Sequence, residues 1–494
     1  MNDLKEKTIR GGVSRLVAQA LNFAIRIGSL VVLARLLDPK DFGIVGMVTA
    51  FTGVLALFRD FGLSSAAVQR AEVTDAQAST LFWINVLVGA ALALITAAAA
   101  PLLVAFYSEP KLLAVTMALA VGFIVNALGV QHSVMLQRQL RFTALSVITT
   151  VSLVAATAVG IGGAAAGFGY WALVLMTVAS PVVYTIGSWV TTAWVPGPPR
   201  RHVGLGSMVR FGATITMNSI VYYGASNLDK VLVGRYLGVE ALGLYGRAYQ
   251  LISIPSDNVN TAAGEVAFSA LSRVRSDAAR LKQYFLKGYS LLLAVTVPVT
   301  IAAGVFAEDV VRVFLGPKWS AAAPIFRLLA PAMLVFAIVN PLGWMMTAIG
   351  RVGRGLKMAL VLAPFMIGAY LAGLPYGPTG VAAAYSAVML LWMLPAIFWA
   401  VHDTPLTGRD VLSTMIRPLG ASVLGAACAI VLEPIYGDLS SALVRLVLES
   451  TVLFAVFAAT LLFPMGHWAF YVDIIRQWRR PTPSADEPGF ARQV

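Results

Sequence analysis

Four cationic side chains fall inside stretches of sequence that are otherwise apolar: Arg26, Lys230, Arg247 and Arg327. A charge at the centre of a bilayer costs on the order of 2.5–3.5 kcal/mol, and such residues mark substrate or ion pathways. Helical spacing puts Arg26 on one polar face with Gln19, Asn22 and Ser29. A guanidinium on that face suits the oxygens of a phosphate group. The alternative is an arginine that pairs with an acidic neighbour or with carbonyl groups to fix helix packing.

A second candidate contact is Arg247, the first residue of the stretch RAYQLISIPSDNVNTAAGE. Gln250 follows Arg247 by about one helical turn. The corresponding earlier stretch, MVTAFTGVLALFRDFGLSS, stays apolar as far as Arg59. We therefore expect the second half of the chain to supply more of the ligand contacts, with Arg247 assisting Arg26 from the opposite side. The alternative for Arg247 is a side chain that extends outward to the membrane surface.

Four acidic residues near membrane depth are candidates for coupling transport to a cation: Asp60, Asp229, Asp257 and Glu265. A carboxylate removed from water takes up a proton readily, so each is a candidate carrier of H⁺ or Na⁺. Asp229 and the adjacent Lys230 point about 100° apart on a helix. For Asp60 and Glu265, capping of a helix near the membrane interface is the alternative role.

The composition places all of these residues in a membrane. The chain has 494 residues, of which 59% are hydrophobic and 12% are charged, whereas soluble domains are typically about 25% charged. Apolar stretches of roughly 20 residues predict an all-α polytopic protein with about fourteen transmembrane helices. These stretches lie near 14–36, 42–62, 80–106, 112–133, 144–165, 168–192, 208–234, 241–265, 286–306, 322–347, 356–374, 378–401, 416–434 and 443–464.

Lysine and arginine are unevenly distributed between the two sides of the membrane. With a cytoplasmic N-terminus, 25 of the 36 fall on the cytoplasmic side and seven on the opposite side, namely Arg35, Lys40, Lys111, Arg235, Arg312, Lys318 and Arg445. The positive-inside rule then predicts that both termini are cytoplasmic. The same bias explains the net charge of +13, so we expect no nucleic-acid partner. The cationic segment 270–288 is either an amphipathic helix on membrane lipids or a simple loop.

A repeat links two parts of the chain at an offset of 200 residues. ARLLDPKDFGIVGM (34–47) is similar to GRYLGVEALGLYGR (234–247), and the polar face around Arg26 becomes a second face that includes Tyr222, Ser226 and Asp229. Six predicted helices separate the copies, so both cross the membrane in the same direction. This predicts two parallel six-helix lobes around a central cavity, related by an axis along the membrane normal. Tyr222 and Ser226 are therefore expected to line that cavity as well.

The repeat also gives the expected domain boundaries. We expect a first six-helix lobe at 1–200, a second at 201–405 and two additional transmembrane helices at 406–475. The polar, proline-rich residues 476–494 are expected to form a disordered cytoplasmic tail. A looser similarity between GFGYWALV (167–174) and GPTGVAAA (377–384) has an offset of 210 and requires insertions.

Several motifs together resemble one branch of a transporter superfamily. ARLLDPKDFGIVGMV, RDFGLSSAAVQR (59–70), MLQRQLRF (135–142) and GFGYWALV are similar to stretches of the polysaccharide biosynthesis or export branch of the multidrug/oligosaccharidyl-lipid/polysaccharide exporter superfamily. The resemblance implies a Wzx-like flippase with two lobes in a V, working by alternating access in the bacterial inner membrane. The implied substrate is a polyprenyl-diphosphate-linked oligosaccharide. A polysaccharide polymerase or export machinery is an implied partner.

Three classes of function compete on the sequence alone. The first is this flippase, the second is a cation-coupled multidrug exporter of the same fold, and the third is a membrane glycosyltransferase or ligase. A cationic cavity favours an anionic substrate over cationic drugs. The sequence has no Walker A, HExxH or GxSxG motif and no sizeable loop for catalytic acids. We therefore expect a transporter without catalytic residues, cofactor or metal.

Overall fold

The computed structural model describes residues 2–59, 74–200, 206–436, 439 and 441–463. At 2–18, 206–226, 255–262, 265 and 266 only the backbone is described. Within these residues the chain is helical, and the described part contains no β-strand. This all-α architecture suits a membrane, because a helix satisfies its own backbone hydrogen bonds in lipid.

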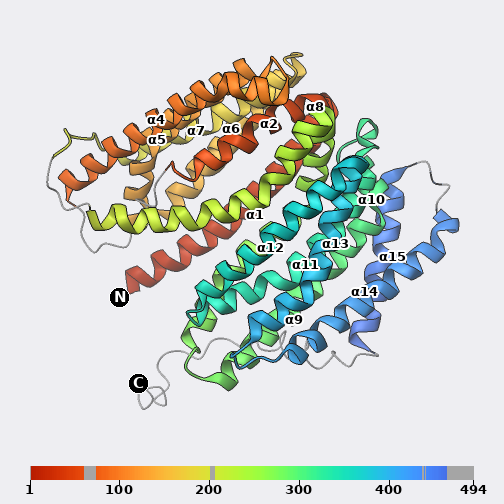
Figure 1. Cartoon of the computed structure of the whole chain (residues 1–494). Coiled ribbons are helices and arrows are strands. Elements are labelled where there is room, and N and C mark those ends of the chain that lie inside the picture. The colour runs from red at the N-terminus through yellow and green to blue at the C-terminus, as the bar shows by residue number, and fades with distance from the viewer. Residues whose placement is uncertain (1, 60–73, 201–205, 437–438, 440, 464–494) are drawn as a thin grey trace, which may run out of the picture.

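The helices form two lobes and a C-terminal hairpin (Figure 1). Lobe one contains α1 (Asn2–Leu36), α2 (Pro39–Ala56), α4 (Asp75–Tyr107), α5 (Leu112–Arg138), α6 (Phe142–Ala165) and α7 (Tyr170–Thr192). Lobe two contains α8 (Gly206–Arg273), α9 (Ala278–Val305), α10 (Ala307–Phe314), η1 (Pro317–Trp319), α11 (Ala322–Ala348), α12 (Val352–Gly373), η2 (Leu374–Tyr376) and α13 (Gly377–Val401). The hairpin consists of α14 (Gly408–Tyr436) and α15 (Ala442–Leu462).

Each of the fourteen predicted spans corresponds to a helix or to half of one. The spans 208–234 and 241–265 are the two halves of α8, which is broken at Gly238 with φ 88° and ψ −178°. Ten helical stretches of the described chain are long and apolar enough to cross a membrane, one of them comprising α12 and α13 together. α2 and α8 are not among the ten, and α8 carries polar residues that include Asp229 and Arg247. The protein is a multi-pass membrane protein.

The segment 270–288 is not a separate surface helix. α8 ends at Arg273 and α9 begins at Ala278, so this segment consists of two helix ends and a short turn. Asp277 caps α9 by accepting hydrogen bonds from the backbone N–H groups of Ala279 and Arg280. Neither a separate amphipathic helix nor a simple loop describes this segment, since most of it belongs to the ends of α8 and α9.

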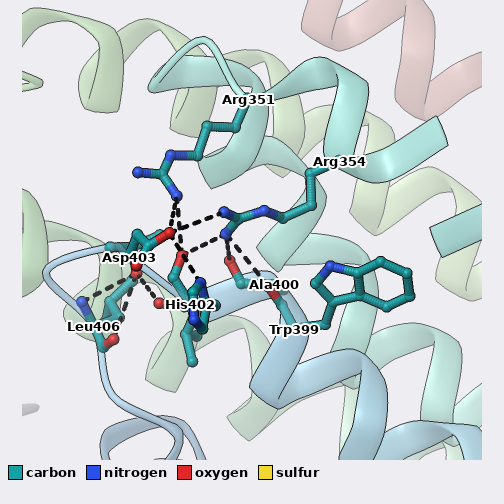
Figure 2. Close-up of polar contacts among 9 residues, drawn as sticks. Arg351, Arg354, Trp399, Ala400, His402, Asp403 and Leu406 are labelled. Carbon is teal, nitrogen blue, oxygen red and sulfur yellow. Dashed lines mark hydrogen bonds and ion pairs between the residues drawn. The ribbon is translucent and has the colours of Figure 1, made fainter. Parts of the chain in front are cut away.

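The lobes share a local detail in which the two donor arginines, Arg141 and Arg351, are offset by 210 residues. Arg141 stands before α6 and donates to the Thr191 carbonyl at the end of α7, with Nη1···O 3.1 Å. Arg351 stands before α12 and donates to the His402 carbonyl after α13, with Nη1···O 3.0 Å (Figure 2). In both lobes a cation satisfies carbonyls that the helix end leaves unpaired. Arg354 adds bonds to the same end of α13 in lobe two.

The glycines of the sequence repeat lie where the lobes meet. α2 packs along α8, and a Cβ built on Gly43 would clash with the backbone carbonyl of Val239. The equivalent glycine 200 residues later is packed in the same way, because a Cβ on Gly243 would clash with the carbonyl of Pro39. Each copy of the repeat thus packs its glycine on the backbone of the other copy. The similarity between 34–47 and 234–247 is explained by this symmetric crossing of two helices.

Candidate functional site

A cavity of about 1050 Å³ lies between the lobes. Lobe one lines it with residues of α1, α2, α5, α6 and α7, and lobe two with residues of the second half of α8. Three arginines reach it: Arg26, Arg59 and Arg247. No acidic side chain lines it among the residues that the structure describes. The described wall of the cavity is therefore positively charged.

Arg26 lies on α1 with Asn22 and Ser29, and all three line the cavity as the helical spacing predicts. The Ser29 hydroxyl donates to the Arg26 carbonyl at 2.9 Å, while the buried Oδ1 of Asn22 has no hydrogen-bond partner among the side chains that the structure describes. Within the described residues Arg26 has no acidic partner, so the packing alternative finds no support there. Gln19 lies farther toward the N-terminus of α1 and does not line the cavity.

Arg247 lines the cavity from the opposite lobe and does not extend outward to the membrane surface. Its guanidinium lies 3.8 Å from the centre of the Phe42 ring and donates to Gln250, which also lines the cavity. A helix rises about 1.5 Å per residue. Measured in this way along the helices from the crossing of the lobes, Arg26 lies at a depth of roughly 15 Å and Arg247 at roughly 13 Å, so their depths are similar. They can therefore approach one ligand from two sides.

Arg59 is the arginine that the sequence reasoning missed. It follows the end of α2, lines the cavity and donates to Asn126 of α5, with Nη1···Oδ1 3.2 Å. Its Nε is buried and has no hydrogen-bond partner among the described residues. On the same count Arg59 lies about 15 Å deeper than Arg26. The available signal was its place at the end of a long apolar run, where it was interpreted as an ordinary cytoplasmic charge.

Between the arginines the cavity wall is uncharged and combines apolar side chains with neutral polar groups. Ser133 and Tyr184 share a hydrogen bond of 2.9 Å, and Asn126 lies beside Arg59. Further hydroxyl groups reach the cavity from α2, α6 and α7: Thr49, Thr52, Thr149, Ser152, Thr177 and Ser180. All of these come from lobe one. The expectation that the second half of the chain supplies more contacts remains a prediction, because the side chains of 206–226, 255–262, 265 and 266 are outside the description.

Asp229 does not line the cavity. It is 1% exposed and lies inside lobe two, where its Oδ2 accepts from the Tyr245 hydroxyl at 2.9 Å and its Oδ1 from the Lys230 N–H at 2.8 Å. The Lys230 ammonium turns to Asn227 and lies 5.1 Å from the Tyr249 ring centre. Asp229 thus lies apart from the cavity, because Tyr245 encloses its carboxylate, and its role as a cation carrier remains a prediction.

The remaining candidates fall outside the description. Asp60 belongs to a segment that the structure does not describe, and the side chains of Tyr222, Ser226, Asp257 and Glu265 lie in the part of α8 whose backbone alone is described. Their expected roles remain predictions. Among the described residues no group of three or more His, Cys, Asp and Glu side chains is placed to hold a metal ion.

Curated relatives come from polysaccharide biosynthesis. The teichuronic acid biosynthesis protein TuaB of Bacillus subtilis (strain 168) is 29% identical over 305 residues, and the match covers 59% of this chain and 61% of TuaB. The lipopolysaccharide biosynthesis protein WzxC of Escherichia coli (strain K12) is 26% identical over 75% of this chain and 77% of WzxC. The succinoglycan biosynthesis transport protein ExoT of Rhizobium meliloti (strain 1021) is 24% identical over 82% of each.

Solved structures share the fold at low identity. The lipid II flippase MurJ in an inward closed conformation superposes with a TM-score of 0.73 at 13% identity, over 95% of this chain and all of MurJ. An inward-facing multidrug resistance transporter of the MATE family gives 0.63 at 14% identity, over 81% of this chain and 99% of that one. A family model described as polysaccharide biosynthesis protein matches residues 32–324. The chain therefore belongs to the polysaccharide biosynthesis protein family, with the fold of the multidrug/oligosaccharidyl-lipid/polysaccharide exporters.

Proposed function

We propose that the protein is a flippase that moves a polyprenyl-diphosphate-linked oligosaccharide across the bacterial inner membrane for exopolysaccharide or O-antigen-type synthesis. The observation that carries this proposal is the interlobe cavity, lined by Arg26, Arg59 and Arg247 with no acidic side chain among its described residues. The family and the names of TuaB, WzxC and ExoT support a carrier for glycan synthesis. A polymerase is then the natural recipient of the transported unit.

The cavity chemistry matches such a substrate in two parts. Arg26 and Arg247 lie at similar depths on opposite lobes, so their guanidinium groups can embrace a diphosphate with charge-assisted hydrogen bonds. The hydroxyl and amide groups of lobe one suit the hydroxyl groups of sugars, and the polyprenyl tail can remain in lipid. Cationic drugs would be repelled by the same wall, which disfavours the multidrug exporter. A glycosyltransferase would need catalytic acids at the substrate.

The orientation is part of the proposal. The positive-inside bias supports cytoplasmic termini, which puts the crossing of α2 and α8 at the outer face. The tight contacts of Gly43 and Gly243 then support an arrangement that is sealed outside and receives substrate from the cytoplasm. Alternating access would open this crossing. The proposed units are lobe one at 1–200, lobe two at 201–405 and additional helices at 406–475, with 476–494 as a cytoplasmic tail.

The buried Asp229 is the proposed coupling group. Its carboxylate is enclosed by Tyr245 and by the N–H of Lys230, away from the cavity, so H⁺ or Na⁺ can bind there without competing with the lipid-linked sugar for space. Loading or release of the cation changes the charge inside lobe two. That change would bias how α8 packs, and α8 also carries Arg247 and the crossing with α2.

The main test is the substitution Arg26→Ala in reconstituted vesicles that contain a lipid-linked oligosaccharide and no nucleotide sugar. A lost charge-assisted bond of roughly 1.5–3 kcal/mol should slow translocation about tenfold to a hundredfold. Arg26→Lys should recover part of the activity, because an ammonium supplies the charge without the bidentate fork. Lys111→Ala is the matched control, since Lys111 is an exposed cation of lobe one that stands over the Tyr170 ring outside the cavity.

Two results would contradict the proposal. Wild-type translocation by Arg26→Ala at equal membrane abundance would remove Arg26 from the site. Transport of a cationic drug, with no movement of the lipid-linked sugar, would assign the protein to the exporter class.

A further inference from the structure

A second cavity, of about 460 Å³, lies at the end of the molecule where the lobes meet. Three parts of the chain enclose it: the end of α1, the segment from α10 to η1, and the start of α15. Its charged residues are Arg35, Arg312 and Lys318, and the described lining contains no acidic residue. Under the proposed orientation this is the outer face. The cavity is separate from the one proposed for the transported substrate.

The concentration of charge here is unusual for that face. Only seven of the 36 Lys and Arg residues are assigned to it, and three of these seven line this one cavity. Cations are generally scarce on the outer side of membrane proteins, so their convergence calls for a specific reason. A salt bridge explains only one of the three cations, because Lys318 pairs with the exposed Asp38 at 3.0 Å. Among the described residues, neither Arg35 nor Arg312 has an acidic partner.

The walls of the cavity are fixed by interlobe hydrogen bonds. The Arg35 guanidinium donates to the Val313 carbonyl at 3.0 Å, and the buried Trp319 indole N–H donates to the Ala34 carbonyl at 2.7 Å. These bonds hold the end of α1 against the segment between α9 and α11. The Arg312 side chain, in contrast, is exposed and has no hydrogen bond to a described residue, so it remains available to a ligand.

The rest of the lining is apolar. Leu443 at the start of α15 is 57% exposed, whereas Leu315, which lines the cavity beside Pro317, is buried. The cations stand at helix ends, which is the depth of the headgroups, and the apolar residues continue along α15 toward the hydrocarbon. A phosphate beside Arg312 with an acyl chain along Leu443 satisfies both parts of the lining.

The geometry points to a binding site for the phosphate headgroup of an anionic phospholipid in the outer leaflet. A lipid bound here touches lobe one, lobe two and the hairpin at once, so it stabilises the arrangement in which the outer crossing is closed. The site does not depend on which molecule the central cavity transports. Only the assignment to the outer leaflet rests on the proposed orientation.

Lipid retention by the full-length protein in detergent tests this site, with phosphatidylglycerol and phosphatidylcholine of the same acyl chains as probes and native mass spectrometry as the readout. We expect the protein to retain phosphatidylglycerol preferentially and Arg312→Ala to weaken that retention about tenfold. Lys318→Ala should weaken it as well. Lys111→Ala should leave it unchanged, because this outer cation lies outside the cavity.

The controls separate a lipid site from a simple anion site. Millimolar inorganic phosphate should leave the phosphatidylglycerol in place, because it makes no contact with the apolar wall. Displacement by phosphate alone, equal retention of the two lipids, or an equal loss in Lys111→Ala would each overturn the proposal. Translocation by the central cavity is measured separately, so an inactive flippase that still binds phosphatidylglycerol would contradict the proposed function alone.

Discussion

Equivalent positions in the two lobes hold different chemistry. Ser29 and Val45 of lobe one line the central cavity. Their counterparts 200 residues later, Asp229 and Tyr245, are 1% and 0% exposed and hydrogen-bond to each other inside lobe two. At these positions lobe one lines the central cavity, whereas lobe two encloses a carboxylate. Under the proposed function, the two halves of the fold divide substrate contact and ion response between them.

The glycine crossing is the place where the lobes should behave alike. Gly43→Ala and Gly243→Ala each introduce a methyl group against a backbone carbonyl of the opposite lobe. Overpacking costs about 1–3 kcal/mol, so closure of the crossing and translocation in vesicles should fall by up to about a hundredfold. Gly246→Ala is the control, because nothing lies within 4 Å of a Cβ at that position. A severe effect in only one of the two lobes would contradict the symmetric crossing.

Arg59→Ala and Arg247→Ala test the unequal contribution of the lobes to the cavity. The buried Nε of Arg59 has no partner in the described part of the chain, whereas Arg247 already packs on Phe42 and donates to Gln250. Arg59→Ala should therefore slow translocation about tenfold, and Arg247→Ala should slow it less. The measurement is the initial rate in vesicles at equal protein abundance. A larger loss in Arg247→Ala would show that lobe two dominates substrate contact.

Asp229→Asn tests the ion response assigned to lobe two. The amide retains an oxygen for the Tyr245 hydroxyl but removes the charge that binds H⁺ or Na⁺. We expect translocation to lose its stimulation by an imposed cation gradient, with a basal rate within a few-fold of wild type. Tyr245→Phe removes one neutral donor and should reduce the stimulation only in part. Full stimulation in Asp229→Asn would exclude this carboxylate as the coupling group.

The arginine caps should give the smallest and most similar effects. Arg141→Ala removes a cation from the end of α7, and Arg351→Ala removes one from the end of α13. Interactions of this kind contribute about 0.3–1 kcal/mol each. Arg351→Ala should be the milder change, because Arg354 also donates to the His402 carbonyl and to those of Trp399 and Ala400 (Figure 2). Thermal unfolding in detergent measures both, and a larger loss in Arg351→Ala would show that Arg354 does not compensate.

The helices and the repeat could be predicted because both follow from local chemistry. Runs of roughly 20 apolar residues specify spanning helices, and the break at Gly238 falls between two predicted spans. Helical spacing correctly placed Asn22, Arg26 and Ser29 on one cavity-lining face. The offset of 200 also indicated that Gly43 and Gly243 are equivalent.

Only the tertiary structure decided which faces meet. Spacing along a helix specifies a face but not its neighbour, so the sequence did not show that Tyr245, sixteen residues away, encloses Asp229. Arg59 was unremarkable in sequence, because its contact with Asn126 joins residues 67 positions apart. The outer cationic cavity likewise combines α1, the α10–η1 segment and α15. Such sites depend on contacts between residues that are far apart in the sequence. The local residue pattern does not show which of these contacts form.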